Sequence, residues 1–280
     1  MMIKALFISV TLLFTTQLIG QNETTFKEEL DVAYYSASNN TDEYINSRCK
    51  LDIRYPENKK DFSTVVWFHG GGLKAYDKYF PEALLNADLC IVSVNYRLSP
   101  KAKAPSYIED AGAAVAWVYK NIESYGGNSS KIFVSGHSAG GYLALMVGLD
   151  KQWLNNFEVD ADSLAGVISL SGQTATHFTI REERGLPKSK TIVDEFAPLN
   201  HARENAPPLL LITGDRNIDL AGRYEENFYL ERLMKTAGHT KTQLFELQGL
   251  GHSEMHDGGI YILTKEVERV SENIDKRKME

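Results

Sequence analysis

The sequence contains few cysteines and no concentration of positive charge. Its 280 residues include two cysteines, Cys49 and Cys90, and neither has neighbours at the spacing of metal ligands. We favour two small buried thiols, while their pairing in a disulfide stays open. The 30 Lys and Arg residues are outnumbered by 37 Asp and Glu residues, giving a net charge of −7. Because no basic run lies within the body of the chain, the sequence argues against a nucleic-acid partner.

Phosphate-binding motifs and long apolar segments are also missing. The glycine-rich turn at residues 136–141 has neither a Gly-x-Gly-x-x-Gly pattern nor a Lys-Ser/Thr pair, as a phosphate loop would require. The apolar run at residues 5–19 is too short and too rich in hydroxyl groups for a membrane span. Internal repeats and domain linkers are absent from the sequence, which favours a single domain.

Residues 1–20 are predicted to be a secretory signal peptide. One positive charge, on Lys4, precedes the apolar run, and the sequence becomes polar after Gly20. We therefore expect the mature protein to begin near Gln21, to work in the periplasm or outside the cell, and to have no stable membrane span after cleavage. A retained anchor is the alternative. A lipid anchor is disfavoured, since no cysteine follows the run.

The remaining sequence alternates between strand-like and helix-like segments, after a polar lead-in at 21–47 that we expect to be loosely ordered. Continuous apolar runs predict strands covered on both faces, as in a parallel sheet. We expect strands near 48–55, 63–68, 89–95, 131–135, 164–170, 209–213 and 241–247, with helices at 104–124, 142–147, 223–237 and 259–274. Over residues 48–280, this alternation predicts one doubly wound α/β domain with a mostly parallel sheet and helices on both faces. Residues 171–205 show no period and are predicted to be a short polar insertion over the active site.

A Gly-x-Ser-x-Gly motif centred on Ser138 follows the strand at 131–135 and precedes the helical run at 142–147. A serine held at such a sharp turn can act as a nucleophile when a base is in reach. Glycine is needed on both flanks, because a Cβ there would clash with the packed strand or helix. The motif alone occurs by chance in many proteins. Its position between a strand and a helix favours a nucleophile over an ordinary glycine-rich turn.

Three consecutive glycines, Gly70 to Gly72, follow His69 at the end of the strand at 63–68. Alone, they fit a flexible turn as well as a functional loop. Combined with a serine turn downstream, they can offer N–H donors to the oxygen that becomes negative when Ser138 attacks a carbonyl.

Four clusters thus follow one another along the chain: His-Gly-Gly-Gly, Gly-x-Ser-x-Gly, an acidic loop after a strand, and a histidine in a glycine-rich loop. In open α/β sheets, ligands bind at the carboxyl ends of the strands, where all four clusters are expected. In these motifs the sequence resembles the α/β-hydrolase superfamily. More narrowly, it resembles the His-Gly-Gly-Gly esterases, which include hormone-sensitive-lipase-like carboxylesterases and carbohydrate-esterase or feruloyl-esterase-like lipases. The matching segments are 69–72, 95–98, 105–117, 125–128, 136–141, 207–210 and 249–252.

The resemblance implies that Ser138 is the nucleophile and His252 the general base. The N–H groups of Gly71, Gly72 and Ala139 would form the oxyanion hole. The implied activity is that of a serine esterase using an acyl-enzyme mechanism, which needs no metal or organic cofactor; with the predicted signal peptide, we expect it to be secreted. We expect its substrate to be a small ester with a short or aromatic acyl group, including esters of carbohydrates. The oligomeric state is not indicated.

The third member of the triad departs from the family pattern. The family places the acid three residues after the glycine that ends the strand, and here Asn217 occupies that position. Asp215 and Asp219 lie two residues to either side, and we expect one of them to reach His252. We favour Asp215, which is closer to the strand. Asn217 also supports a second hypothesis, a catalytically impaired ligand-binding protein, and a peptidase or amidase of the same fold is a third.

Three other histidines compete for roles in this arrangement. We expect His69 to orient the glycine loop and His137, inside the serine motif, to point away from the substrate. His256 is a weaker candidate for the base, since His252 fills the family's Gly-x-x-His position. Tyr76, Tyr79 and Phe80 follow the glycine loop, where they would either line a pocket or pack in the ordinary way, and we favour ordinary packing.

Overall fold

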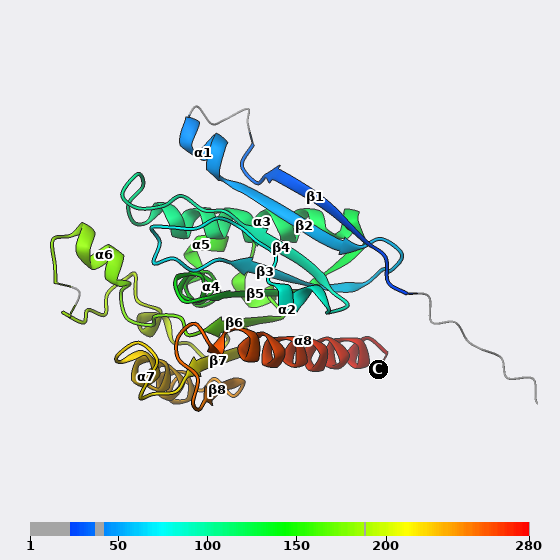
Figure 1. Ribbon diagram of the computed structural model, residues 1–280. Coiled ribbons are helices and arrows are strands. Elements are labelled where there is room, and N and C mark those ends of the chain that lie inside the picture. Colours follow the sequence, from blue (N-terminus) through cyan, green and yellow to red (C-terminus); the bar gives the residue numbers. More distant parts are fainter. Residues whose placement is uncertain (1–22, 37–41, 188, 280) are drawn as a thin grey trace, which may run out of the picture.

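A computed structural model describes residues 23–36, 42–187 and 189–279; the predicted signal peptide lies outside the described residues. The described chain forms a twisted central sheet flanked by helices (Figure 1). Its eight strands lie in the order β1-β2-β4-β3-β5-β6-β7-β8. In chain order they are β1 (Phe26–Ala33), β2 (Lys50–Pro56), β3 (Phe62–Phe68), β4 (Cys90–Val94), β5 (Gly127–His137), β6 (Gly166–Leu170), β7 (Leu209–Gly214) and β8 (Thr242–Leu247).

The sheet is parallel from β4 through β3, β5, β6 and β7 to β8, and antiparallel where β2 joins β4 and β1 joins β2. The predicted fold class, a mostly parallel sheet with helices on both faces, is confirmed. The burial of adjacent residues in β3 shows why the parallel strands have continuous apolar sequences. Val65 packs into one hydrophobic cluster and Val66 into the other, so both faces of the strand are buried.

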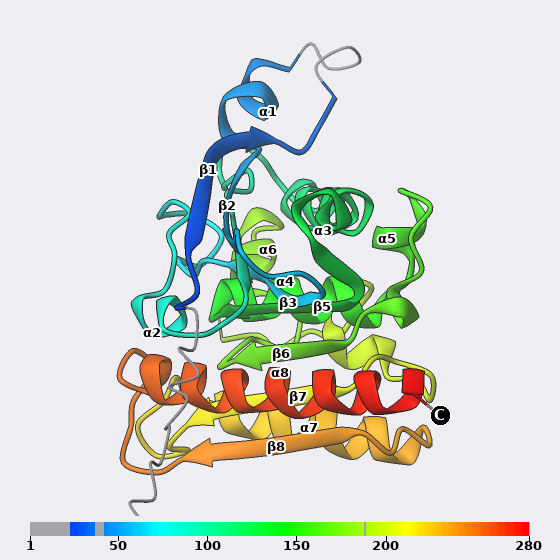
Figure 2. The same ribbon diagram turned by 90° about the vertical axis from the view of Figure 1, so that its right-hand side faces the viewer.

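Different helices cover the two faces of the sheet (Figure 2). Helices α3 (Ser106–Tyr125), α4 (Ala139–Leu149), α5 (Gln152–Asn155) and α7 (Arg223–Thr236) contribute apolar residues to the cluster that contains Val66. Helices α2 (Glu82–Leu85) and α8 (Met255–Met279) contribute to the cluster that contains Val65. The domain therefore has three layers, with the sheet in the middle.

The lead-in expected to be loosely ordered instead contains β1 and a short helix, α1 (Glu43–Arg48). Strand β1 pairs with β2 at the edge of the sheet, and most of its side chains are exposed. Because both faces of this edge strand meet solvent over most of its length, its sequence lacks the apolar alternation that would have revealed it. Asp42 accepts hydrogen bonds from the first N–H groups of α1 and caps that helix.

The segment predicted as a polar insertion contains helix α6 (Phe178–Glu183) and a 3₁₀ turn, η3 (Pro198–His201); another 3₁₀ turn, η2 (Ala161–Ser163), precedes β6. The first part of the predicted insertion, residues 171–181, is mostly buried despite its polar composition. The buried hydroxyls are paired: Thr174 donates to the carbonyl of Glu226, and Thr179 donates to that of Gly72. The insertion therefore packs against the glycine loop.

Helix α8 begins one turn before the predicted start at residue 259, because the glycines at 258–259 lie inside the helix. A Cβ on Gly259 would lie 2.9 Å from Cδ2 of Leu170, so this glycine allows the helix to pack closely on β6. Among the described helices, none is both long and apolar enough to cross a membrane. Cys49 and Cys90 are both buried and free within the described chain, as we favoured.

The register of the parallel strands places their carboxyl ends at one edge of the sheet. Phe68 pairs with Gly136, His137 with Leu170, and Gly214 with Leu247. The residues that follow these strand ends include the glycine corner, Ser138, Ser171, the acidic loop and the histidine loop. Segments separated by more than a hundred positions are thereby brought to one place.

Candidate active site

Ser138 occupies the sharp turn between β5 and α4, with φ 57° and ψ −115°. A non-glycine residue held at positive φ is strained, and such strain gathers at functional turns. The flanking glycines are required as predicted. A Cβ on Gly136 would lie 2.5 Å from the carbonyl oxygen of Phe68, and one on Gly140 would lie 1.9 Å from the same atom. The strand and the helix therefore cross too closely for any side chain at these positions.

The glycine corner lies directly beside this turn. A Cβ on Gly70 would be 3.6 Å from Cβ of Ser138. Gly71 and Gly72 have φ values of 96° and 63°, in the left-handed region that glycine enters without strain. A Cβ on Gly71 would lie 2.3 Å from the carbonyl oxygen of Ala75, because the chain folds back on itself there.

His69 is hydrogen-bonded to a backbone carbonyl of the glycine corner, in agreement with its predicted role of orienting this loop. Its Nδ1 donates to the carbonyl of Gly70 at 2.8 Å, and its ring stacks on Tyr96 with centroids 4.4 Å apart. The Tyr96 hydroxyl donates to the carbonyl of His69 at 2.8 Å. Burial lowers the pKa of His69 to about 4, so the ring stays neutral.

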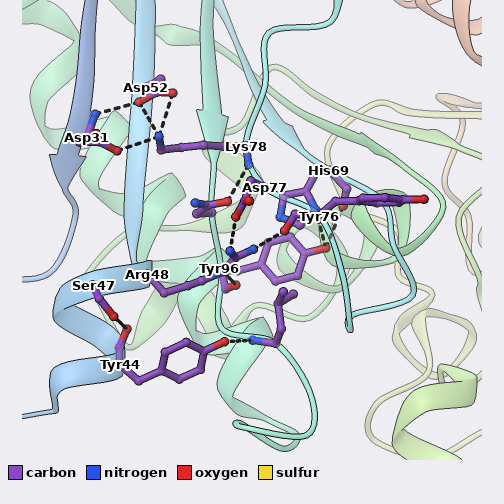
Figure 3. A network of polar contacts seen from close by, with 12 residues as sticks. Asp31, Tyr44, Ser47, Arg48, Asp52, His69, Tyr76, Asp77, Lys78 and Tyr96 are labelled. Carbon is purple, nitrogen blue, oxygen red and sulfur yellow. Dashed lines mark hydrogen bonds and ion pairs between the residues drawn. The ribbon is translucent and has the colours of Figure 1, made fainter.

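The segment after the glycines is fastened by residues from the N-terminal part of the chain (Figure 3). Arg48, the last residue of α1, donates through Nε to the carbonyl of Tyr96 at 3.0 Å and through Nη2 to the carbonyl of Tyr76 at 2.5 Å. It also forms an ion pair with Asp77. Lys78 forms ion pairs with Asp52 of β2 and Asp31 of β1. Residues from α1, β1 and β2 thus support the loop that carries Gly71 and Gly72.

Three N–H groups are available where an oxyanion hole was expected. Among the described residues, no backbone carbonyl accepts a hydrogen bond from the N–H of Gly71, Gly72 or Ala139. Ala139 is the first residue of α4, where an N–H has no partner within the helix and the helix dipole favours negative charge. The arrangement is suited to stabilising an oxyanion next to Ser138.

His252 and Asp219 form a hydrogen-bonded pair at the same edge. Nδ1 of His252 lies 2.8 Å from Oδ1 of Asp219, whose side chain is almost completely buried. Because a carboxylate only accepts, Nδ1 carries the proton and Nε2 is the acceptor nitrogen. A base in this tautomer can remove a proton from a hydroxyl.

The Asp219 carboxylate accepts four hydrogen bonds. His252 and the N–H of Leu220 donate to Oδ1, and the hydroxyl of Ser171 and the N–H of Gly214 donate to Oδ2. Burial by itself would raise the pKa of this carboxyl. The hydrogen bonds from His252, Ser171 and Leu220 outweigh that effect and lower the pKa to about 2. Asp219 is therefore ionised throughout the neutral range.

Our preference for Asp215 as the histidine's partner is wrong. Oδ1 of Asp215 accepts from the backbone and side chain of Asn217, and Oδ2 accepts from the N–H of Gly249. No contact of Asp215 or Asn217 with His252 is found in the described structure. Asp215 instead stabilises its own loop, which is the alternative role that short acidic side chains commonly take after strands.

His137 and His256 surround His252 without taking its place. We expected His137 to point away from the substrate, yet it lines the cavity, and its Nε2 donates to the carbonyl of His252 at 2.8 Å. Burial, followed by the proximity of His252, lowers the pKa of His137 to about 4. His256 pairs with Asp257, whose side chain is 84% exposed and is a poorer counter-ion than buried Asp219.

These residues line one cavity of about 840 Å³. Ser138 and His252 both face it, together with Gly70, Gly71 and Gly72. Its apolar walls come from residues far apart in the sequence: Tyr76, Tyr79, Phe178 and Leu220. Tyr76 and Tyr79 thus line a pocket, although we favoured ordinary packing for them, whereas Phe80 packs against the apolar cluster on one face of the sheet. A cavity of this size suits a small organic ligand.

Sequence reasoning missed three contributors to this site. Ser171 contacts both Asp219 and His252, and its position immediately after the strand at 164–170 was a signal that could have been used. Phe178 lies in a segment without periodicity and gave no such signal. Arg48 precedes β2 and acts through the backbone of the glycine loop, which no sequence pattern indicates.

Comparison with known proteins places these features in a family. The BD-FAE family matches residues 51–223 of the chain. Esterase LipC of Mycobacterium tuberculosis is 28% identical over 219 residues, which cover 69% of this chain and 52% of LipC. Carboxylesterase NlhH of the same organism is 38% identical over 97 residues, or 33% of this chain and 30% of NlhH. The chain thus spans about half the length of LipC and less of NlhH.

Solved structures share the fold at low sequence identity. A truncated carbohydrate esterase from gut microbiota has a TM-score of 0.72 at 20% identity, covering 90% of this chain and 98% of that one. A butyrate-bound esterase of Thermogutta terrifontis, Est2, has a TM-score of 0.64 at 19% identity, covering 89% of this chain and 93% of Est2. The resemblance to α/β-hydrolase esterases inferred from the motifs is confirmed.

Proposed function

The chain belongs to the BD-FAE family, and from this premise we propose that it is a serine esterase that hydrolyses carboxylic esters through an acyl-enzyme. One observation carries the proposal. Ser138 at its strained turn and His252, paired with buried Asp219, line the same cavity beside the glycine corner. The relatives named esterase and carboxylesterase support the same activity.

The proposed reaction uses these groups in two steps. Oγ of Ser138 attacks the ester carbonyl carbon while Nε2 of His252 takes the hydroxyl proton. The N–H groups of Gly71, Gly72 and Ala139 stabilise the oxyanion, and Asp219 stabilises the imidazolium. Collapse of the intermediate expels the alkoxide, which receives the proton from His252 and leaves as the alcohol. Water, deprotonated in the same way, then releases the acid and restores Ser138.

The cavity favours small esters with an uncharged alcohol. Tyr76, Tyr79 and Phe178 provide aromatic surface for an aromatic acyl group or a sugar ring. The charged residues among the cavity's described lining are Asp77, Glu254 and Asp257, all acidic, and they would repel an anionic substrate. We therefore propose short acyl or aromatic acyl esters, including esters of neutral carbohydrates, as substrates. The carbohydrate esterase of the same fold supports this choice.

We also propose that the protein acts outside the cytoplasm. The charged start, the apolar run at 5–19 and the polar residues that follow support an N-terminal signal peptide. N-terminal sequencing of protein from the periplasm or medium of the native host should give a start near Gln21. Full-length protein in the cytoplasm would contradict this location without affecting the proposed chemistry.

A single substitution tests the proposed activity. Hydrolysis of p-nitrophenyl acetate by the wild type should be lost in Ser138→Ala, because no other hydroxyl stands at the turn between strand and helix. Circular dichroism would establish that the variant is folded. An inactive wild type, or a variant as active as the wild type, would remove the esterase assignment.

A substrate panel tests the finer proposal. Acetylated and feruloylated neutral sugars should be hydrolysed with higher kcat/KM than the matching uronate esters, because the charged residues in the described lining of the cavity are acidic. Preference for uronate esters would contradict the substrate class. Preference for peptide amides over all esters would identify a peptidase or amidase of the same fold.

A further inference from the structure

Ser171 is a buried serine with an unusual backbone conformation, immediately after β6. Its φ of 47° lies in the left-handed region, and none of its surface is exposed. A glycine would adopt this conformation without strain but would have no hydroxyl. A strained residue with a polar side chain at the carboxyl edge of the sheet is a reason to look for a function.

The hydroxyl of Ser171 contacts both members of the His252–Asp219 pair. It donates to Oδ2 of Asp219 at 2.8 Å, and its oxygen lies 3.0 Å from Nδ1 of His252. Since Nδ1 also lies 2.8 Å from Oδ1 of Asp219, its proton is placed between two acceptor oxygens. The serine, the aspartate and the histidine thus form a closed triangle of hydrogen bonds.

The backbone of Ser171 is held at both of its polar groups. Its N–H donates to the carbonyl of Ile212 at 2.6 Å, which ties it to β7. Its carbonyl accepts from Nη1 of Arg223, whose side chain is buried at the start of α7. Asn227, one turn later, donates to the carbonyl of Gly172 at 2.9 Å. The position of the hydroxyl is therefore determined by the sheet and by α7.

We propose that Ser171 is a positioning residue of the active site, acting on the base through Asp219; this inference rests on the esterase function proposed above. The terminal torsion of an aspartate is broad, so a carboxylate can rotate unless both oxygens are held. The Ser171 hydroxyl and the N–H of Gly214 fix Oδ2, which leaves Oδ1 facing His252. The serine oxygen also accepts a hydrogen bond from Nδ1–H of His252, and this bond becomes stronger when the ring is a positively charged imidazolium.

Removal of this hydroxyl has a specific expected effect. In Ser171→Ala, kcat should fall about tenfold or more with KM nearly unchanged, because a hydrogen bond to a charged group is lost from the transition state but not from substrate binding.

The other charged or titratable groups around this pair are unchanged in the variant. His137 is the last residue of β5, His256 comes from α8 and Arg223 from α7. Ser169→Ala is a matched control. It removes a buried hydroxyl two residues earlier, within β6, whose oxygen has no partner among the described residues. Its kcat should stay within about twofold of the wild type.

Two further variants separate positioning from a structural role. Ser171→Gly also lacks the hydroxyl but relieves the backbone strain, so it remains foldable and should lose as much kcat as Ser171→Ala. In an Asp219→Ala background, where the residual hydrolysis is followed at high enzyme concentration, Ser171→Ala should change kcat by less than about twofold, because its partner is gone.

The proposal is overturned if Ser171→Ala or Ser171→Gly keeps wild-type kcat, if KM rises as much as kcat falls, or if the loss is the same in the Asp219→Ala background. These outcomes are distinct from failure of the esterase function itself. In that case the wild type is inactive or Ser138→Ala is as active as the wild type, and no comparison at Ser171 arises.

Discussion

Nδ1 of His252 and Oδ1 of Asp219 lie 2.8 Å apart, although the aspartate stands two residues beyond the position where the motif spacing places an acid. The loop after β7 accounts for this. The N–H of Asp219 donates to the carbonyl of Asp215 at 2.8 Å, which closes a helical turn. The turn leaves Asn217 exposed and directs the next acidic side chain inward. An asparagine at the expected position therefore does not indicate an impaired enzyme.

Replacement of the aspartate distinguishes the two candidates for the acid. Asp219→Asn should lower kcat on p-nitrophenyl acetate by about 10³- to 10⁴-fold, because the amide favours the wrong imidazole tautomer and cannot stabilise the imidazolium. Asp215→Asn removes a carboxylate of the same loop whose hydrogen bonds, among the described residues, go to its own loop and to the histidine loop. Its kcat should fall by about tenfold or less. The reverse order of effects would return the assignment to Asp215.

The carboxylate of Asp219 makes the free energy of unfolding depend on pH. Its pKa is about 2 in the folded protein, below the ordinary value of 3.8, so its stabilising contribution is fully present above about pH 4. That contribution is lost as the pH falls toward 2. The wild type should lose about 2 kcal/mol of unfolding free energy relative to Asp219→Asn over this interval. Urea unfolding of both proteins at pH 5 and pH 2.5 measures the difference, and an unchanged difference would show that the pKa is not depressed.

The parallel core and the nucleophile turn could be predicted from sequence because their signals are local. Val65 and Val66 lie in an apolar run that only a doubly covered strand explains. The nucleophile turn is marked by the Gly-x-Ser-x-Gly spacing around Ser138, although the contacts that require its glycines include the carbonyl of Phe68 in β3. The histidine was found for a similar reason, since it stands in a short glycine-rich loop after the last strand.

The features that were missed depend on tertiary contacts. Strand β1 is an exposed edge strand, so hydrophobic periodicity does not mark it. Asp219 and Asp215 are equivalent in sequence, and the backbone turn that separates their roles is not encoded in residue type. Ser171 is one of many serines, and its role emerges only where β6 meets the loops after β7 and β8.

A substitution at the glycine corner tests the proposed oxyanion hole. Gly71→Ala forces a Cβ to within 2.3 Å of the carbonyl oxygen of Ala75 at a φ of 96°, so the loop must move and its N–H must turn away. We expect kcat to fall by about 10²- to 10³-fold.

Gly185→Ala is the control for backbone strain, since that glycine has a φ of 71° with open space around it. It should destabilise the protein by about 1 kcal/mol and leave kcat unchanged. Equal losses of kcat in the two variants would contradict a specific role for the corner.

The support of the glycine loop by the N-terminal part of the chain gives the last prediction. Arg48→Met keeps the apolar stem of the side chain but removes the donors to the carbonyls of Tyr76 and Tyr96, and the ion pair with Asp77. The loop would then be free to shift, and displaced N–H groups stabilise an oxyanion poorly, so kcat should fall about tenfold.

Arg269→Met is the control, because it breaks an exposed ion pair with Glu266 within α8. Its kcat should stay within about twofold of the wild type. Arg48→Lys keeps the charge without the planar fork and should recover little of the activity. Full recovery by lysine would mean that the charge near Asp77, and not the hold on the two carbonyls, supports the site.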